Sequence, residues 1–141
     1  MDFLELSKII KGIELIDDKI FIKSDVAKAL KFFKENYSFT LLKEIIAVDN
    51  KEMGIELIYR IFSPTDEENV LISTVAENNE AESVSMIFDS ATADEKEIYD
   101  LFGVNFIGNP ELKRLYMPES WVGHPLKKDY EEKDERLSWN D

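Results

Sequence analysis

The sequence predicts an α+β fold, with helices packed on an antiparallel or mixed sheet and an irregular C-terminal arm. Three observations lead to this prediction. Apolar residues recur at helical spacing near the N-terminus and within residues 84–102, and residues 39–76 contain closely connected β-type segments. After Gly103, Gly and Pro punctuate the chain and little regular structure is expected. Because 141 residues is the size of one domain, we expect an α+β domain over residues 1–108 and an interaction arm over residues 109–141.

The first predicted elements are short. Apolar residues in segment 3–10 recur at helical spacing and predict an N-terminal helix. Residues 13–16 and 19–22, with a polar turn between them, predict two short strands or a hairpin. Ser24 is a good N-cap, because its side chain can accept a hydrogen bond from a free backbone N–H. The helix that it opens is expected to end near Asn36 and to bury one face, formed by Val26, Ala27, Leu30 and Phe32 or Phe33.

The middle of the chain changes to a β pattern. Residues 39–48, 55–62 and 70–76 predict three strands, and their short connections favour an antiparallel meander. Helical spacing then returns at Val84, Ile87 and Phe88, and again at Ile98, Leu101 and Phe102.

Composition excludes several classes of site. The chain has no Cys, which excludes a disulfide framework and a thiolate-ligated zinc or iron–sulfur centre, and its single His excludes a site built on several His ligands. A carboxylate cluster is the remaining, unspecific possibility for a metal. Our prediction of no catalytic, cofactor or metal site on this chain agrees with this composition, but it rests on the family resemblance given below.

The charge of the chain indicates its partners. A formal charge of −13 argues against nucleic acid and against adsorption on anionic lipid. Most of the excess lies between Pro64 and Asp100, where eleven acids face one base, Lys96, and most of them are interpreted as a solvated face. Asp2 and Glu5 interrupt any signal peptide, and no apolar run approaches the length of a membrane span. We expect a cytoplasmic protein that reaches a membrane only by sitting on another protein.

Residues 95–130 carry the most specific pattern. The stretch reads EKEIYDLFGVNFIGNPELKRLYMPESWVGHPLKKDY, with closely spaced aromatics, charges of both signs and several Gly or Pro turns. Core packing does not ordinarily need so many Gly and Pro turns or so many charged residues. The stretch therefore predicts a surface that meets another protein.

The same residues resemble the signature of the C-subunit family of respiratory complex I, the NADH:quinone oxidoreductase, and of its counterparts in energy-converting membrane-bound nickel–iron hydrogenases. The family pattern has an E-R-E run, two spacer residues, an acid, two apolar residues and a glycine, then G-H-P-x-L-x-R, then G-H-P-L-R-K-D with an aromatic. The first block here is Glu95, Glu97, Asp100, Leu101, Phe102 and Gly103; the second is Gly108, Pro110, Leu112 and Arg114; the third is Gly123, His124, Pro125, Leu126, Lys128, Asp129 and Tyr130. The departures are Lys96 for Arg, Asn109 for His, Lys127 for Arg, and Glu131 where many members carry Pro.

The resemblance implies a non-catalytic structural subunit in the peripheral arm of a membrane-bound redox complex. Such a chain docks on the large subunit that holds the quinone site or the nickel–iron site, and itself carries no flavin, iron–sulfur cluster or quinone. It would be an accessory subunit of an oxidoreductase, peripheral on the inner face of the cell membrane. The shortness of the chain tilts the expectation toward the hydrogenase type. The residues expected to bind the partner are Glu95, Glu97, Asp100, Phe102, Gly103, Gly108, Pro110, Leu112, Arg114, Trp121, Gly123, His124, Pro125, Leu126, Lys127, Lys128, Asp129 and Tyr130.

The residues themselves support local roles. Glu95 and Glu97 lie two apart, so on a helix they point to different sides and form no catalytic pair. We expect them to complement the helix dipole and to form salt bridges with nearby bases. Gly103 is the expected C-cap. His124 precedes a proline, which holds it in an extended or turn conformation, where it hydrogen-bonds or stacks across an interface or bonds within the domain.

Two further hypotheses belong to other functional classes. A free-standing acidic α+β module that recruits a basic protein would make the three blocks a coincidence, and predicts a monomer without an exposed apolar groove. A carboxylate hydrolase would need a cleft in which two acids converge, and no spacing here requires one.

Overall fold

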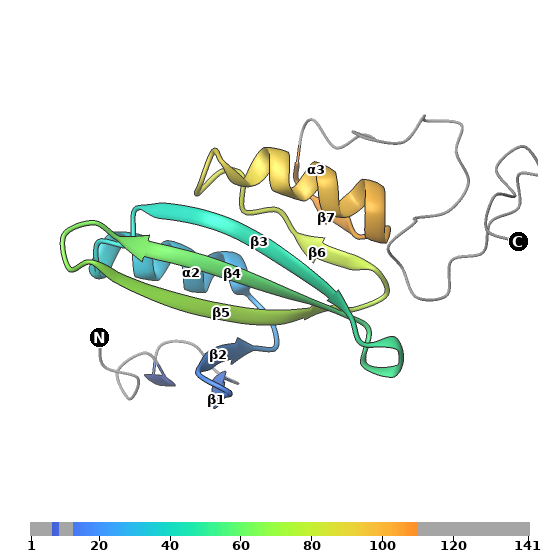
Figure 1. Ribbon diagram of the computed structural model, residues 1–141, viewed down its shortest axis with the longest axis horizontal. Helices are drawn as coiled ribbons and strands as arrows, with labels where there is room; N and C mark the ends of the chain where they lie inside the picture. The colour runs from blue at the N-terminus through green and yellow to red at the C-terminus, as the bar shows by residue number, and fades with distance from the viewer. Residues whose placement is uncertain (1–6, 9–12, 110–141) are drawn as a thin grey trace, which may run out of the picture.

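The computed structural model describes residues 7–8 and 13–109, and it places a five-stranded mixed sheet at the centre of the chain (Figure 1). The strand order is β1 (Ile13–Ile16), β2 (Lys19–Ile22), β5 (Glu68–Ala76), β4 (Ile55–Ser63) and β3 (Leu41–Asp49). Strands β2 and β5 are parallel and every other neighbouring pair is antiparallel. This confirms the predicted α+β class, the β1–β2 hairpin and the antiparallel β3–β4–β5 meander.

Helix α2 (Val26–Asn36) covers one face of the sheet (Figure 1). Its buried residues recur at helical spacing: Val26, Ala29, Leu30 and Phe33. The predicted N-cap is wrong by one position, because Asp25 precedes the first helical residue in a left-handed conformation (φ 61°) and makes no side-chain cap. The helix ends at Asn36, as predicted.

Strand β4 shows how the sheet divides into two faces. Every second residue is buried, from Ile55 through Tyr59 to Ser63, and the residues between them are half-exposed. The buried set joins the buried residues of α2 in one hydrophobic core, which also includes Val84, Phe88, Val104 and Phe106 from the C-terminal half of the described chain. The opposite face carries the half-exposed set.

A second, smaller unit follows the sheet. It consists of β6 (Glu80–Glu82), α3 (Ala91–Phe102), and β7 (Asn105–Ile107), and the two strands pair in parallel. Both strands are absent from the sequence prediction, because three residues are too few to show a period. The helix predicted around Val84 and Phe88 is wrong: the Phe88 N–H donates to the Val84 carbonyl over 2.9 Å, but this single turn does not continue. A 3-10 turn, η1 (Lys51–Met53), forms the short connection between β3 and β4.

Helix α3 is fixed to the outer edge of strand β3. The Ser90 hydroxyl donates to the Leu42 carbonyl over 3.0 Å, and the Ile45 N–H donates to the Asp94 carboxylate over 3.2 Å. The register of β3 against β4 shifts between Leu42 and Glu44, as at a β-bulge. The bulged strand therefore has part of its edge covered by the helix that carries the first block.

Candidate partner-binding site

The carboxylate of Glu95 is the centre of the described part of the candidate site. Its side chain is completely buried although it lies in the second turn of α3. One oxygen accepts from the Ser83 hydroxyl over 2.6 Å and from the Asn109 side-chain amide over 2.9 Å, and the other accepts from the Val84 N–H over 2.8 Å. The carboxylate thus ties α3 both to the segment after β6 and to Asn109, the second residue after β7.

The contact with Asn109 joins the first block to the second. Asn109 is one of the departures from the family pattern, and its amide still supplies a hydrogen bond to the first block. Gly108, just before it, has φ 100°, a left-handed conformation that favours glycine. The start of the predicted arm is therefore held by Glu95.

Within the described residues, Glu95 forms no salt bridge with a base, which differs from the expected role. Burial raises its pKa, against the lowering effects of the Ser83, Val84 and Asn109 donors, and the neighbouring Asp94 charge raises it further. Within the described part of the chain, its carboxylate is held by hydrogen bonds from uncharged donors. The expected divergence of the two glutamates is confirmed, because Glu97 is exposed while Glu95 is buried.

The raised pKa of Glu95 predicts a pH dependence of stability. A carboxyl with a higher pKa in the folded state binds its proton more tightly when folded, so stability is greatest below the ordinary pKa and falls as pH rises toward the raised value. For one proton the slope reaches at most about 1.4 kcal/mol per pH unit. We expect urea unfolding across this acidic window to show that the free energy of unfolding declines with pH in the wild type and declines less in Glu95→Gln.

Asp94 also has a pKa raised chiefly by burial, so Asp94→Asn is the control that separates the two groups. Parallel profiles for wild type and Glu95→Gln would contradict the prediction.

Tyr59 has a buried hydroxyl that is close enough to the Glu95 carboxylate for the charge of Glu95 to affect its pKa. The residue lies on β4, is completely buried, and its hydroxyl has no hydrogen-bond partner within the described part of the chain. Burial raises the pKa of Tyr59 strongly, and the negative charges of Glu95 and Glu82 raise it further. The hydroxyl is therefore neutral at all physiological pH values.

An unpartnered buried hydroxyl predicts an unusual sign for a conservative substitution. Tyr59→Phe removes a polar group that is desolvated without compensation, so we expect the free energy of unfolding to stay unchanged or to rise by about 1 kcal/mol. Urea unfolding of the purified variant measures this. A loss of stability beyond about 1 kcal/mol would mean that the hydroxyl is hydrogen-bonded in solution.

The rest of the first block lies along and just after α3. Asp100 is completely buried, and Phe102 is half-buried against the core. Gly103 is the C-cap, as predicted, with φ 79°, and its N–H donates to the Tyr99 carbonyl over 3.0 Å. The block thus serves the packing of α3 as well as any contact outside the chain.

The structure brings together only part of the predicted site. Glu95, Glu97, Asp100, Phe102, Gly103 and Gly108 are described, whereas Pro110, Leu112, Arg114, Trp121, Gly123, His124, Pro125, Leu126, Lys127, Lys128, Asp129 and Tyr130 lie outside the described residues, as do Lys113, Tyr116 and most of the predicted N-terminal helix. Over residues 7–8 and 13–109 no helix is long and apolar enough to span a membrane. The same residues contain no group of three or more His, Asp or Glu placed to hold a metal ion.

Sequence reasoning missed the donors of the Glu95 site. Ser83 and Val84 lie 12 and 11 residues before Glu95, outside the signature, and their residue types are ordinary for a loop. The one available signal was an acid flanked by an apolar helical face, since Glu95 precedes Ile98 by three residues. That spacing places the carboxylate above the buried side of the helix.

The matches to known proteins include the signature residues 95–130. The family model described as the 30 kDa subunit of respiratory-chain NADH dehydrogenase matches residues 21–136. The C subunit of the NADH-quinone oxidoreductase of Geotalea uraniireducens is 35% identical over 112 residues, which cover 77% of this chain and 68% of that protein. The C/D subunit of the NADH-quinone oxidoreductase of Phocaeicola vulgatus is 38% identical over 94 residues, covering 64% of this chain and only 18% of that longer protein.

Two solved structures share the fold. A chain of the membrane-bound sulfane sulfur reductase, an archaeal respiratory membrane complex, superposes with a TM-score of 0.73 at 22% identity, covering 91% of this chain and 82% of that one. The trypsin-resistant fragment of Nqo5 superposes with a TM-score of 0.55 at 24% identity, covering 77% of this chain and 96% of that one.

Proposed function

The chain belongs to the family of the 30 kDa subunit of respiratory-chain NADH dehydrogenase, and we propose that it is a non-catalytic structural subunit in the peripheral arm of a membrane-associated redox complex. Its partners are other subunits of that complex. The observation that carries the proposal is the family match over residues 21–136, which includes all three signature blocks in order.

The finer proposal concerns the partner. We infer that the chain docks on the large subunit that holds the quinone site or the nickel–iron site, and that residues 109–141 lie over it. The arm begins at Asn109, whose side-chain amide donates to the Glu95 carboxylate, so its first residue is attached to α3. Four bases of the arm, Lys113, Arg114, Lys127 and Lys128, suit carboxylates of a partner.

Affinity purification from membranes of the native host tests both levels. The tagged full-length chain is expected to recover a large subunit, identified by mass spectrometry, and iron is assayed in the eluate together with nickel and flavin. A large subunit with Cys pairs for nickel indicates a hydrogenase-type complex, and a Cys-free homologue with flavin-bearing partners indicates the NADH dehydrogenase type. A bait that returns alone under gentle detergent would contradict the proposal and favour a free-standing binding module.

A charge-reversal pair addresses the arm itself. Lys127→Glu with Lys128→Glu places repulsive charges where carboxylates are expected, so we expect recovery of the large subunit to fall. The matched control is Lys28→Glu with Lys31→Glu, because both lysines are exposed on α2, a helix outside the signature. Equal loss with both pairs would show an effect of net charge and not of the arm.

A further inference from the structure

The sheet face opposite the core carries an apolar band, which we call the open face. The strand register places Ile46 beside Ile58, Ile58 beside Ser73, and Ser73 beside Phe21, so a row of large apolar side chains crosses four strands with one serine between them. Neighbouring positions of the same face add Val48, Phe62, Leu71 and Val75. The solvent-facing side of an antiparallel sheet normally carries polar residues, so this apolar band needs an explanation.

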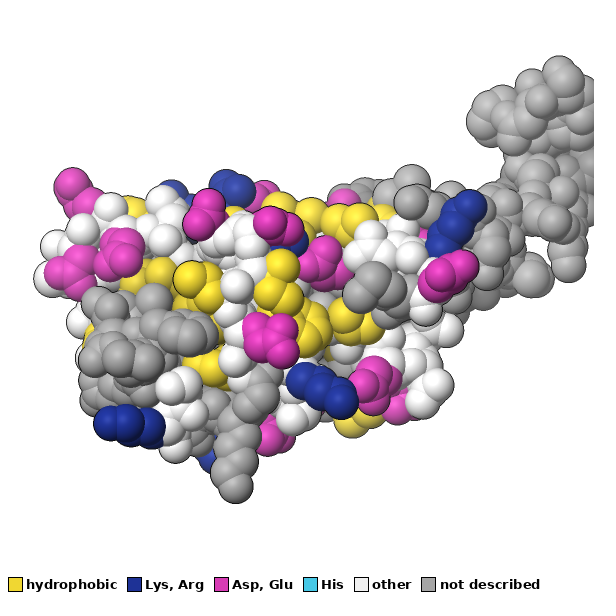
Figure 2. Space-filling view, turned by 90° about the horizontal axis from the view of Figure 1, so that it is seen from below, with side chains coloured by type: hydrophobic (Ala, Val, Ile, Leu, Met, Phe, Trp, Pro, Cys, Tyr) yellow, Lys and Arg dark blue, Asp and Glu magenta, His cyan; other side chains and the backbone are white. Residues whose placement is uncertain are grey.

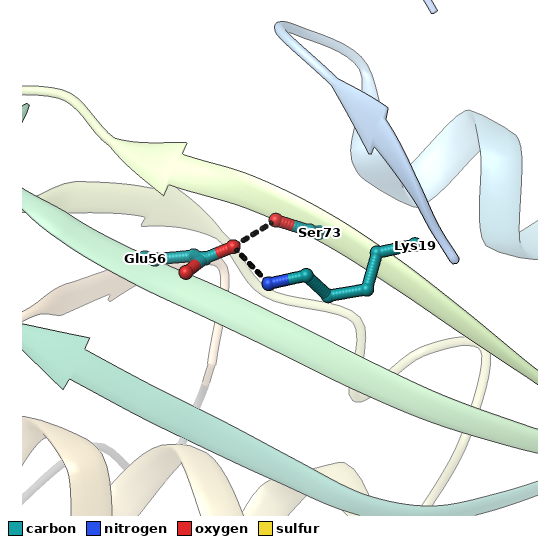
Figure 3. A network of polar contacts seen from close by, with 3 residues as sticks. All are labelled: Lys19, Glu56 and Ser73. Carbon is teal, nitrogen blue, oxygen red and sulfur yellow. Dashed lines mark hydrogen bonds and ion pairs between the residues drawn. The ribbon is translucent and has the colours of Figure 1, made fainter. Parts of the chain in front are cut away.

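Four charged residues of the open face form ion pairs with one another, Lys19 with Glu56 and Arg60 with Glu44. Figure 3 shows Lys19 from β2, Glu56 from β4, and Ser73 from β5 meeting on one face: the lysine lies 3.0 Å from the carboxylate, and the serine hydroxyl donates to it over 2.6 Å. Arg60 pairs with Glu44 at 3.2 Å. The Lys43 ammonium lies over the Phe62 ring, 4.1 Å from its centre.

The open face is therefore neutral on a strongly acidic protein. Its three bases, Lys19, Lys43 and Arg60, balance its three acids, which are Glu14, Glu44 and Glu56, while the whole chain carries −13. Burial raises the pKa of Glu56, but the contacts with Ser73 and Lys19 outweigh burial and hold that pKa below its ordinary value, so the charge persists into mildly acidic conditions. This balance favours contact with an uncharged surface.

Within the described residues, the helices leave this face bare. The buried residues of α2 and α3 belong to the core on the other side, and none of the apolar residues of the open face packs against that core. At the end of the sheet beside β1, a hollow of about 450 Å³ is lined by Arg60 and Leu71 of this face and by Leu15, Ile20 and Val70 of the other, so it does not belong to the open face alone. Figure 2, which views the molecule from below, the side of β1 and β2 in Figure 1, shows hydrophobic side chains between acidic and basic ones there.

We propose that the open face is a second docking surface, which binds an uncharged, apolar surface of another subunit of the complex. The inference rests on the proposed function as a subunit. A second copy of this chain is the less suitable occupant, because two molecules of charge −13 repel one another. An apolar partner gains from burying Ile46, Ile58 and Phe21 without having to neutralise a charge.

The test compares variants of the full-length tagged chain in the same membrane purification. Ile58→Glu and the milder Val48→Glu place a carboxylate on the open face, and we expect each to reduce recovery of neighbouring subunits at least about tenfold, the effect of a 1.4 kcal/mol loss. The matched control is Met86→Glu, because Met86 is 90% exposed and lies in the segment before α3. Met86→Glu is expected to leave recovery of neighbouring subunits unchanged.

Circular dichroism and thermal unfolding of the isolated variants establish that each has folded. If Ile58→Glu does not fold, Val48→Glu, on the edge strand, still tests the docking surface.

Footprinting identifies the occupant. Hydroxyl-radical modification of Val48, which is 37% exposed, and of the partly exposed Phe21 is expected to be measurable in the isolated chain and several-fold lower in the purified complex. Protection in the isolated chain at low concentration would show that its own segment covers the face, and protection that appears only with self-association would show a second copy; either result overturns the proposal. If the wild type recovers neighbouring subunits and the open-face variants recover them equally, only the docking surface is refuted. If the wild type recovers none, the proposed function itself fails.

Discussion

Glu95→Ala is expected to lower the free energy of unfolding by about 2–4 kcal/mol. The substitution leaves the Ser83 hydroxyl, the Val84 N–H and the Asn109 amide without their shared acceptor in a buried space. Each buried polar group without a partner costs about 1–3 kcal/mol, although partial rehydration of the cavity offsets part of the sum. Urea unfolding monitored by circular dichroism measures the loss.

Two controls define what the Glu95 result means. Glu97→Ala lies two residues along the same helix at an exposed position and is expected to change stability by less than about 0.5 kcal/mol. Glu95→Gln keeps the shape and one acceptor oxygen, so we expect an intermediate loss. If Glu95→Ala were as stable as Glu97→Ala, the assignment of Glu95 as a buried, hydrogen-bonded carboxylate would be wrong.

Phe33→Ala is expected to lower the free energy of unfolding by about 3–5 kcal/mol. Phe33 is completely buried under the sheet and its ring meets Phe39 edge-to-face at a centroid distance of 5.6 Å, with Tyr37 at 6.1 Å. The truncation removes the apolar contacts of α2 with the core and leaves a cavity that the surrounding rings cannot fill. Thermal and urea unfolding measure the effect.

The neighbouring residue supplies the control for Phe33. Phe32 lies on the same helix and is only partly buried. Phe32→Ala therefore removes the same aromatic side chain from α2 but takes less buried apolar surface away from the core. We expect it to cost clearly less than Phe33→Ala. Equal costs would indicate that the face of α2 directed at the sheet is centred one residue earlier than the structure places it.

Elements with a long or strong period were predictable from the sequence. Strand β4 alternates over nine residues, and the face of α2 repeats at helical spacing, so both were placed within one or two residues. The α3 helix and its C-cap at Gly103 were also predicted, because glycine marks the left-handed position that ends a helix. Local chemistry determines these features.

Features that depend on tertiary contacts were not predictable in the same way. Strands β6 and β7 have three residues each, and their parallel pairing exists because α3 brings them together. The turn at Val84 and Phe88 has helical spacing, yet the chain continues into a loop before α3 begins at Ala91. From the sequence alone, Glu95 is predicted to be a surface acid, because only the folded structure brings the donors of Ser83, Val84 and Asn109 to its carboxylate.

The attachment of α3 to the edge of β3 has a consequence for the chain before assembly. A long edge strand with free backbone groups can pair with another unfolded or newly made molecule and propagate an aggregate. Ser90 and Asp94 occupy the Leu42 carbonyl and the Ile45 N–H, and the bulge between Leu42 and Glu44 interrupts the straight edge. An orphan subunit awaiting its complex thus has a poor template for strand addition along the first half of β3.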